Sequence, residues 1–141
     1  MNGLSLAQAQ AIVAGTLKEA RSRDAKPLAV IVLDAGGHPV AFAREDGATY
    51  FRRTIAAAKA TGALGMGADT RVLAQRAVGN PVFFQSVAAA VGGDIAFSPG
   101  GVLVRTGSAV IGAVGVSGDT GECDEECALA GIAAAGLGDE K

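Results

Sequence analysis

The sequence predicts an α+β fold in which helices pack against one antiparallel sheet. Apolar segments of strand length follow one another along the chain and are separated by short glycine-containing turns. Such turns suit hairpins, whereas a parallel sheet needs helical crossovers between its strands. Amphipathic segments with helical spacing precede and follow these strands. The chain has 141 residues, which favours a single domain over 1–141 with one buried core.

The amino-terminal segment 5–25 predicts the first helix. Its apolar residues recur at helical spacing. Ser5 and Gln8 have the spacing of a capping box, in which a hydroxyl and an amide satisfy free N–H groups of the first turn. Pro27 ends the helix, because the residue before a proline disfavours helical dihedrals.

A β-hairpin follows the first helix. Residues 28–34 form a continuous apolar run, typical of a strand that is covered on both faces. Residues 38–45 return as the partner strand. Gly36 and Gly37 lie between the two runs, where they supply the positive φ angles of a tight turn.

The remainder of the chain predicts further helices around a second group of strands. Periodicity indicates helices over 49–65, 70–79 and 121–137, while 80–93 fits either a short helix or a loop. Segment 94–118 contains two or three strands, because two glycine-containing turns interrupt it. The order of these elements again favours an antiparallel sheet with helices packed on it.

Composition excludes several classes of protein. The net charge of −2 argues against a nucleic-acid partner, which usually demands a basic face. No apolar stretch has the length of a membrane span, and the amino-terminal sequence lacks the features of a signal peptide, so we expect a cytoplasmic protein. Half of the residues are apolar and the mean hydropathy is +0.35, which predicts a homo-oligomer that buries apolar surface between subunits. Cys123 and Cys127 are interpreted as small helix residues, and no metal site is predicted.

Lys59 is the most isolated charge in the predicted helices. It lies in the alanine-rich segment IAAAKATGA, where one side of the helix has to meet the sheet. A solvated or snorkelling side chain fits this position. A buried amine that anchors an anion or acts as a base fits it equally well. Because a buried ammonium group is costly unless it is paired, the second alternative requires a carboxylate nearby.

Three carboxylates are candidates for that partner and for proton transfer. Asp34 closes the predicted strand 28–34, and Asp124 and Glu125 begin the last helix. Together with Lys59 they form the predicted catalytic set. Each also has a purely structural alternative, since aspartate caps turns and acids stabilise the amino-terminal end of a helix.

Four further charged residues are predicted to bind a ligand: Arg44, Asp46, Arg52 and Arg53. They end the hairpin or begin the next helix. His38 is the single histidine and lies in the hairpin turn, where solvent is the expected neighbour. A Ser-His-Asp triad is therefore not expected.

Three ordered segments resemble the haem-degrading, or GlcG/HbpS-like, family. They are VIVLDAGGHPVAFAREDGA, IAAAKATGAL and GGVLVRTGSAVIGAVGVSGDTGECDEECALAG. The resemblance extends from about Leu4 to Leu137. It implies a profilin-like α+β domain with a five-stranded antiparallel sheet, and it implies homo-oligomers. Some relatives bind haem through a histidine of the first helix, which this chain lacks, and others are small proteins from catabolic operons.

Two functions remain open from the sequence, beside a structural oligomer that binds no ligand. One is binding of haem or a related tetrapyrrole in an apolar slot, with Arg44, Arg52 or Arg53 holding the propionates. The alternative is a cofactor-independent lyase or isomerase that acts on a small anionic organic acid at a subunit-interface pocket, with Lys59 as anchor or base. Fold resemblance alone does not decide between them.

Overall fold

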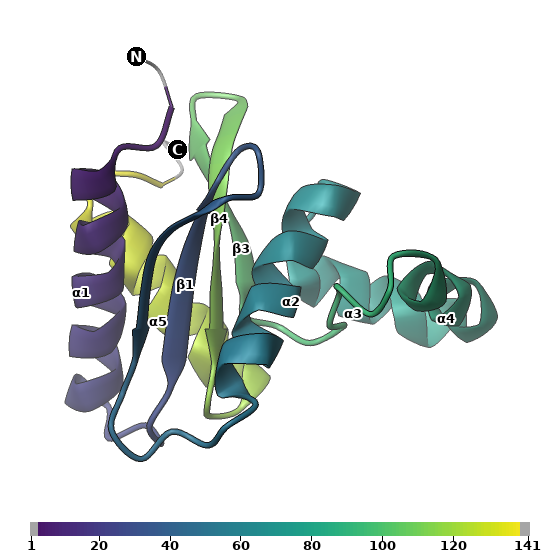
Figure 1. Cartoon of the computed structure of the whole chain (residues 1–141), viewed down its shortest axis with the longest axis horizontal. Helices are drawn as coiled ribbons and strands as arrows, with labels where there is room; N and C mark the ends of the chain where they lie inside the picture. The colour runs from purple at the N-terminus through teal and green to yellow at the C-terminus, as the bar shows by residue number, and fades with distance from the viewer. Residues whose placement is uncertain (1–2, 139–141) are drawn as a thin grey trace.

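The computed structural model describes residues 3–138, which form one antiparallel sheet between two helical layers (Figure 1). The elements in chain order are α1 (Leu6–Ser22), β1 (Ala29–Asp34), β2 (Pro39–Arg44), α2 (Arg52–Met66), α3 (Thr70–Gly79), α4 (Pro81–Ala90), β3 (Gly101–Thr106), β4 (Ala109–Ser117) and α5 (Gly121–Ala134). The strand order is β2-β1-β4-β3. Helices α1 and α5 cover one face, and α2 covers the other. Within the described residues no helix is both long enough and apolar enough to cross a bilayer.

The described part of the sheet has four strands, so the expectation of five is wrong. Segment 94–98 forms no strand, and α4 occupies most of the segment that fitted a helix or a loop. The free edge of β3 explains the difference. The Asp69 carboxylate accepts a hydrogen bond from the Leu103 N–H at 2.9 Å, and Thr70 Oγ1 accepts one from the Gly101 N–H at 2.8 Å. Side chains at the start of α3 thus satisfy the N–H groups that a fifth strand would have used.

The predicted cap and hairpin are present. Ser5 Oγ accepts from the Gln8 N–H at 3.1 Å, and Gln8 Oε1 accepts from the Ser5 N–H at 2.9 Å, which completes the capping box of α1. In the β1–β2 turn Gly37 has a φ of +84°, and Gly36 is outside the positive-φ region. One glycine therefore suffices for this turn.

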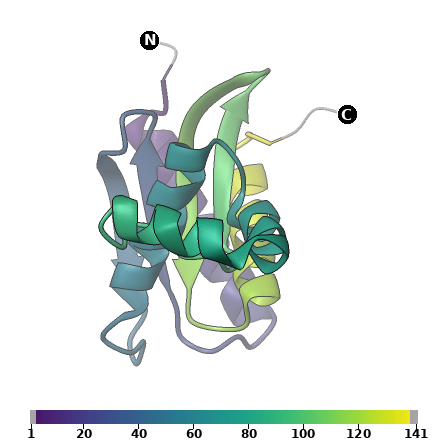
Figure 2. The ribbon, with the colours of Figure 1, turned by 90° about the vertical axis from the view of Figure 1, so that its right-hand side faces the viewer.

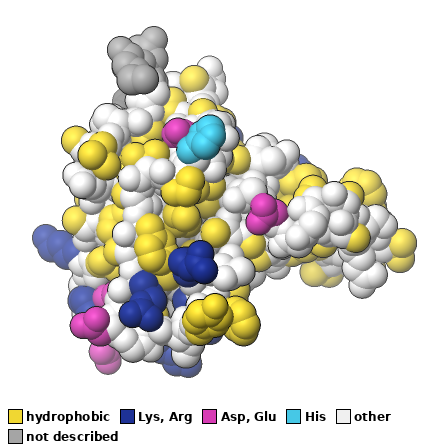
Figure 3. All heavy atoms as spheres, in the orientation of Figure 1, with side chains coloured by type: hydrophobic (Ala, Val, Ile, Leu, Met, Phe, Trp, Pro, Cys, Tyr) yellow, Lys and Arg dark blue, Asp and Glu magenta, His cyan; other side chains and the backbone are white. Residues whose placement is uncertain are grey.

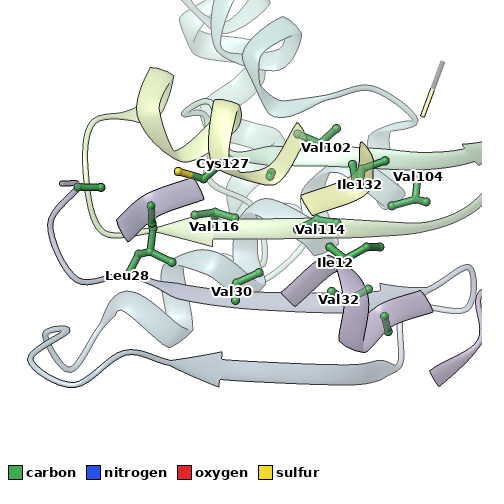
Figure 4. Packing of buried hydrophobic residues seen from close by; sticks show 14 of the residues in the cluster. Ile12, Leu28, Val30, Val32, Val102, Val104, Val114, Val116, Cys127 and Ile132 are labelled. Carbon is green, nitrogen blue, oxygen red and sulfur yellow. The ribbon is translucent and has the colours of Figure 1, made fainter. Parts of the chain in front are cut away.

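Strand β1 contributes to two cores, as its continuous apolar sequence predicts. Val30 and Val32 face α1 and α5, where they meet Ile12, Cys127 and other buried residues of that layer (Figure 4). The intervening residues of β1 face the alanines of α2. The side chains of a strand alternate between its faces, so a centrally placed strand that is covered on both sides is apolar at every position.

Small residues let α2 approach the sheet closely. Its inner face consists largely of alanine, and Ala56, Ala60 and Ala63 are buried against the sheet. A Cβ atom added to Gly115 of β4 would overlap the carbonyl oxygen of Ala56, and one added to Gly101 of β3 would overlap that of Lys59. The backbones of the helix and the sheet therefore lie closer than any larger residue at these two positions would allow.

Helices α3 and α4 extend outward from the face of the sheet that α2 covers (Figures 1 and 2). Leu73 and Phe84 are buried, and Phe84 makes edge-to-face contacts with Phe83 and Phe97. The outer side of this pair of helices is apolar, and its side chains are exposed by 75% at Val82 and 51% at Phe83.

We expect Gly115→Ala to lower the free energy of unfolding by about 2 kcal/mol, because overpacking a close contact forces the helix away from the sheet. Gly65→Ala is the matched control. Gly65 belongs to the last turn of α2, and a Cβ atom added there would have no other atom within 4 Å. Alanine is the better helix former, so this control is expected to gain about 0.5–1 kcal/mol. Urea denaturation measures both changes, and equal stabilities would contradict the close-contact argument.

Candidate functional site

Lys59 lies in the interior between α2, β4 and α5. Its side chain is only 3% exposed, and Asp124 is equally buried. Lys59 Nζ lies 3.2 Å from Asp124 Oδ2 and donates a hydrogen bond of 2.9 Å to the Val116 carbonyl. Asp124 also accepts hydrogen bonds from the Gly118 and Asp119 N–H groups, at 3.3 and 2.9 Å. The pair therefore connects α2 with the end of β4 and the beginning of α5.

Burial lowers the pKa of Lys59, because desolvation disfavours the charged amine. The nearby Asp124 carboxylate opposes this effect, and the Arg52 guanidinium adds to it. Arg52 itself donates from its guanidinium to Ser117 Oγ at 3.1 Å. The buried amine thus has one acidic partner in the same low-dielectric environment.

Asp34 lies at the other end of β1 from this pair. It stands opposite Gly112, whereas Val30 stands opposite Val116, the residue that Lys59 contacts. Four residues of strand separate the two positions by about 13 Å. Asp34 Oδ1 instead accepts hydrogen bonds of 3.0 Å from the N–H groups of His38 and Gly36, which lower its pKa. This is the geometry of a turn-capping aspartate.

The other predicted residues are dispersed. Glu125 forms an ion pair with Arg71 of α3 at 3.2 Å. Arg53 is exposed on α2. Arg44 and Asp46 lie at the end of β2, on the side of the molecule where α1 ends. Residues 3–138 contain no cluster of three or more histidine, cysteine or acidic side chains arranged to hold a metal ion.

A groove runs between α1 and the edge strand β2, and we call it the α1–β2 groove. Its apolar part has a volume of about 490 Å³, which is within the usual range for small-molecule sites. The residues that line this part are Gln10, Val13, Ala14, Leu17, Val40, Ala41 and Phe42. The α1 residues recur at helical spacing and form one stripe along the helix.

A second, polar cavity of about 460 Å³ is lined by Arg21, Pro27, Arg44, Glu45 and Asp46, and we treat it as the polar end of the groove because it begins one helical turn beyond Leu17. Arg21 follows Leu17 by one helical turn. Phe42 and Arg44 pair with Ile31 and Ala29 of β1, so their side chains lie on the α2 side of the sheet and they border the groove at its edge strand. Arg21 donates two hydrogen bonds to the Glu45 carboxylate, at 2.9 and 3.1 Å. Figure 3 shows hydrophobic side chains over this part of the molecule, with lysine and arginine side chains below them.

Arg44 and Asp46, which the sequence predicts to bind a ligand, line the polar end of this groove, whereas the apolar part of the groove was missed. The residues of α1 were interpreted only as a helix that packs on the core. One signal was available, because Val13, Leu17 and Arg21 form a second stripe beside the buried residues Ile12 and Thr16. When the apolar stripe of a helix is wider than the surface that packs on the core, part of the stripe remains exposed.

Comparison with known protein families shows to which family the chain belongs. The model of the haem-degrading HbpS-like protein family matches residues 4–133. The chain is a member of this family. A comparison with curated protein sequences finds no match.

Three solved structures are similar to the chain. HbpS is 28% identical with a TM-score of 0.81, over 94% of this chain and 90% of HbpS. The Klebsiella pneumoniae protein ORFY is 27% identical with a TM-score of 0.87, over 96% of this chain and 92% of ORFY. PduOC, solved as a complex with haem, is 24% identical with a TM-score of 0.88, over 99% of both chains. The likeness to PduOC shows a shared fold.

We expect Lys59→Met to lower the free energy of unfolding by about 3 kcal/mol, since it leaves the buried Asp124 carboxylate without its cation. Adding Asp124→Asn to this variant should recover part of the loss, because it removes the unpaired charge. Lys18→Met, at an exposed position of α1, is the control and should change stability by less than about 0.5 kcal/mol. Chemical denaturation tests this, and a Lys59→Met variant as stable as the control would contradict a stabilising role for the pair.

Proposed function

We propose that this protein binds haem or a related tetrapyrrole in the α1–β2 groove. The observation that supports this most directly is the form of the groove, which is apolar along most of its length and has arginines at one end. A tetrapyrrole has the complementary distribution, with an apolar ring and two carboxylates on one edge. Membership of the haem-degrading family and the PduOC complex with haem add support.

The length of the groove suits this class of ligand. The lining residues of α1 extend from Gln10 to Arg21, which corresponds to about 16 Å of helix at 1.5 Å per residue. A tetrapyrrole ring with its propionates extended is of similar length. In this arrangement Val13, Leu17 and Val40 contact the ring and exclude water from one of its faces.

The two arginines have different tasks in this proposal. Arg21 is engaged with Glu45, and its guanidinium also donates to the Ala25 carbonyl at 2.6 Å. It therefore fixes the end of the groove. Arg44 is exposed and has no ion-pair partner among residues 3–138. It is the cation that can pair with a propionate of the ligand.

The sequence-based assignments of the other charged residues find less support. Arg52 is engaged with Ser117, and Lys59 is enclosed with Asp124. An enzyme built on Lys59 would need an opening to solvent at that amine. The lyase or isomerase alternative therefore stays a prediction, and no observation of the structure favours it.

We also propose that the protein is a homo-oligomer. The exposed apolar side chains of the α3–α4 region support this, because α4 has no charged residue and presents Val82 and Phe83 to solvent. Val78 and Val91 lie at either side of this surface and are also exposed. Contiguous apolar surface of this kind is typical of subunit interfaces. The cytoplasmic location expected from the sequence stays a prediction.

We expect Ala14→Glu to weaken haem binding by about tenfold or more, because a carboxylate in the groove repels the propionates of the ligand and has to be desolvated when the apolar ring binds. Ala7→Glu introduces the same charge at an exposed position of α1 that does not line the groove. Absorption titration with haem compares the two variants. Equal affinities would show that haem does not bind in this groove.

Arg44→Glu is expected to weaken haem binding by about tenfold, because it replaces the propionate partner with a like charge. Arg76→Glu makes the same change at an exposed position of α3 and should bind as the unchanged protein does. A similar loss in both variants would indicate a general effect of net charge and contradict the specific role of Arg44.

Light scattering is expected to give a multiple of the 13.9 kDa chain mass. Phe83→Glu should shift the protein towards the single-chain mass, because it places a charge in the proposed apolar interface. Val110→Glu, at an exposed position of β4 remote from α4 in sequence, is the control. A single-chain mass for the unchanged protein at micromolar concentration would refute the oligomer.

A further inference from the structure

The lining of the α1–β2 groove contains no side chain that ordinarily coordinates haem iron. Protein ligands of haem iron are histidine, cysteine, methionine and tyrosine. The apolar part of the groove is lined by six apolar residues and Gln10. Its polar end is lined by arginines, acidic residues and a proline. The groove thus suits the ring and the carboxylates of a tetrapyrrole but offers nothing of this kind to a metal at its centre.

The potential iron ligands elsewhere in residues 3–138 do not belong to the groove lining. His38 lies in the β1–β2 turn with its side chain 81% exposed, and its Nδ1 is directed at Asp34 at 3.4 Å. Cys123 and Cys127 belong to α5 and pack in the core between this helix and the sheet, where burial raises the pKa of Cys127 to about 12. Tyr50 precedes α2 in an exposed position, and Met66 lines a separate cavity beside Ile95.

We infer that the α1–β2 groove binds tetrapyrroles without coordinating their metal, so that it accepts metal-free and open-chain tetrapyrroles as readily as haem. This inference rests on the proposed function. The contacts that the groove offers are apolar burial of the ring and ion pairing of its carboxylates. Both are independent of the metal, because porphyrins without iron and linear tetrapyrroles retain the apolar rings and the propionates.

A preference for haem over metal-free porphyrin requires a difference between their binding free energies. A ligand bond to iron adds binding free energy for haem alone, and a site that lacks this bond has no means of preferring haem over its metal-free form. The shape of the groove does not restore a preference, because haem and its metal-free form have the same macrocycle and the same propionates. The wild-type affinities for the two forms should therefore agree within about threefold.

The test compares ferric protoporphyrin IX with metal-free protoporphyrin IX on the full chain. Absorption and porphyrin fluorescence titrations give the two dissociation constants. The expected result is a ratio within about threefold and a haem spectrum that His38→Ala leaves unchanged. A preference for haem of about tenfold or more, or loss of haem binding in His38→Ala with porphyrin binding retained, would overturn the inference and leave the proposed function intact.

A gain-of-ligand variant makes the test specific to the groove. Ala14→His places an imidazole in the groove wall and should raise haem affinity by about tenfold or more without changing metal-free porphyrin affinity. Ala7→His is the matched control outside the groove lining. Equal haem affinities of the two histidine variants would overturn the inference by placing the ring elsewhere. Failure of both porphyrins to bind the unchanged protein would refute the proposed function itself.

Discussion

The contact between α2 and the sheet is the constraint on which the arrangement of this protein depends. The glycines of β3 and β4 allow the helix backbone to touch the strands, and this closeness encloses Lys59. The amine is stabilised there because Asp124 and the Val116 carbonyl lie within reach. Asp124 in turn holds the N–H groups of the β4–α5 connection. The ion pair thus connects α2 to the start of α5, the helix that packs on α1, β3 and β4.

The coverage of the sheet determines where a ligand can bind. Helix α2 packs on β1, β4 and β3 but leaves β2 beyond its reach. Phe42 is consequently 41% exposed although it belongs to a strand paired with the central β1. Helix α1 lies against β2 from the other face, and the groove forms where this helix meets the uncovered edge strand. The candidate site thus depends on β2 being an edge strand, because the groove lies between this strand and α1.

The sequence predicted the features that depend on neighbours along the chain or on regular alternation. The capping box of Ser5 and Gln8, the β1–β2 hairpin and the two-sided burial of β1 are of this kind. The burial of a charge at Lys59 remained one of two alternatives, because an alanine-rich helix does not show which side meets the sheet. The placement of Asp34 and the number of strands depend on contacts between distant segments, such as Asp69 with β3. No sequence motif marks the groove, because ordinary apolar residues of α1 and β2 form it and these elements lie side by side only in the folded chain.

The two edges of the sheet differ in their capacity for further pairing. At β3 the outward N–H groups of Gly101 and Leu103 are already bonded to side chains of Thr70 and Asp69, whereas β2 lies at the opposite edge. A sheet that can extend from both edges can grow without limit into a filament. A sheet with a single available edge can only pair with the available edge of another sheet, and the joined pair then has no available edge. The hydrogen bonds from β3 to Thr70 and Asp69 at the start of α3 therefore oppose growth of the sheet from its β3 edge, which disfavours fibrous assembly.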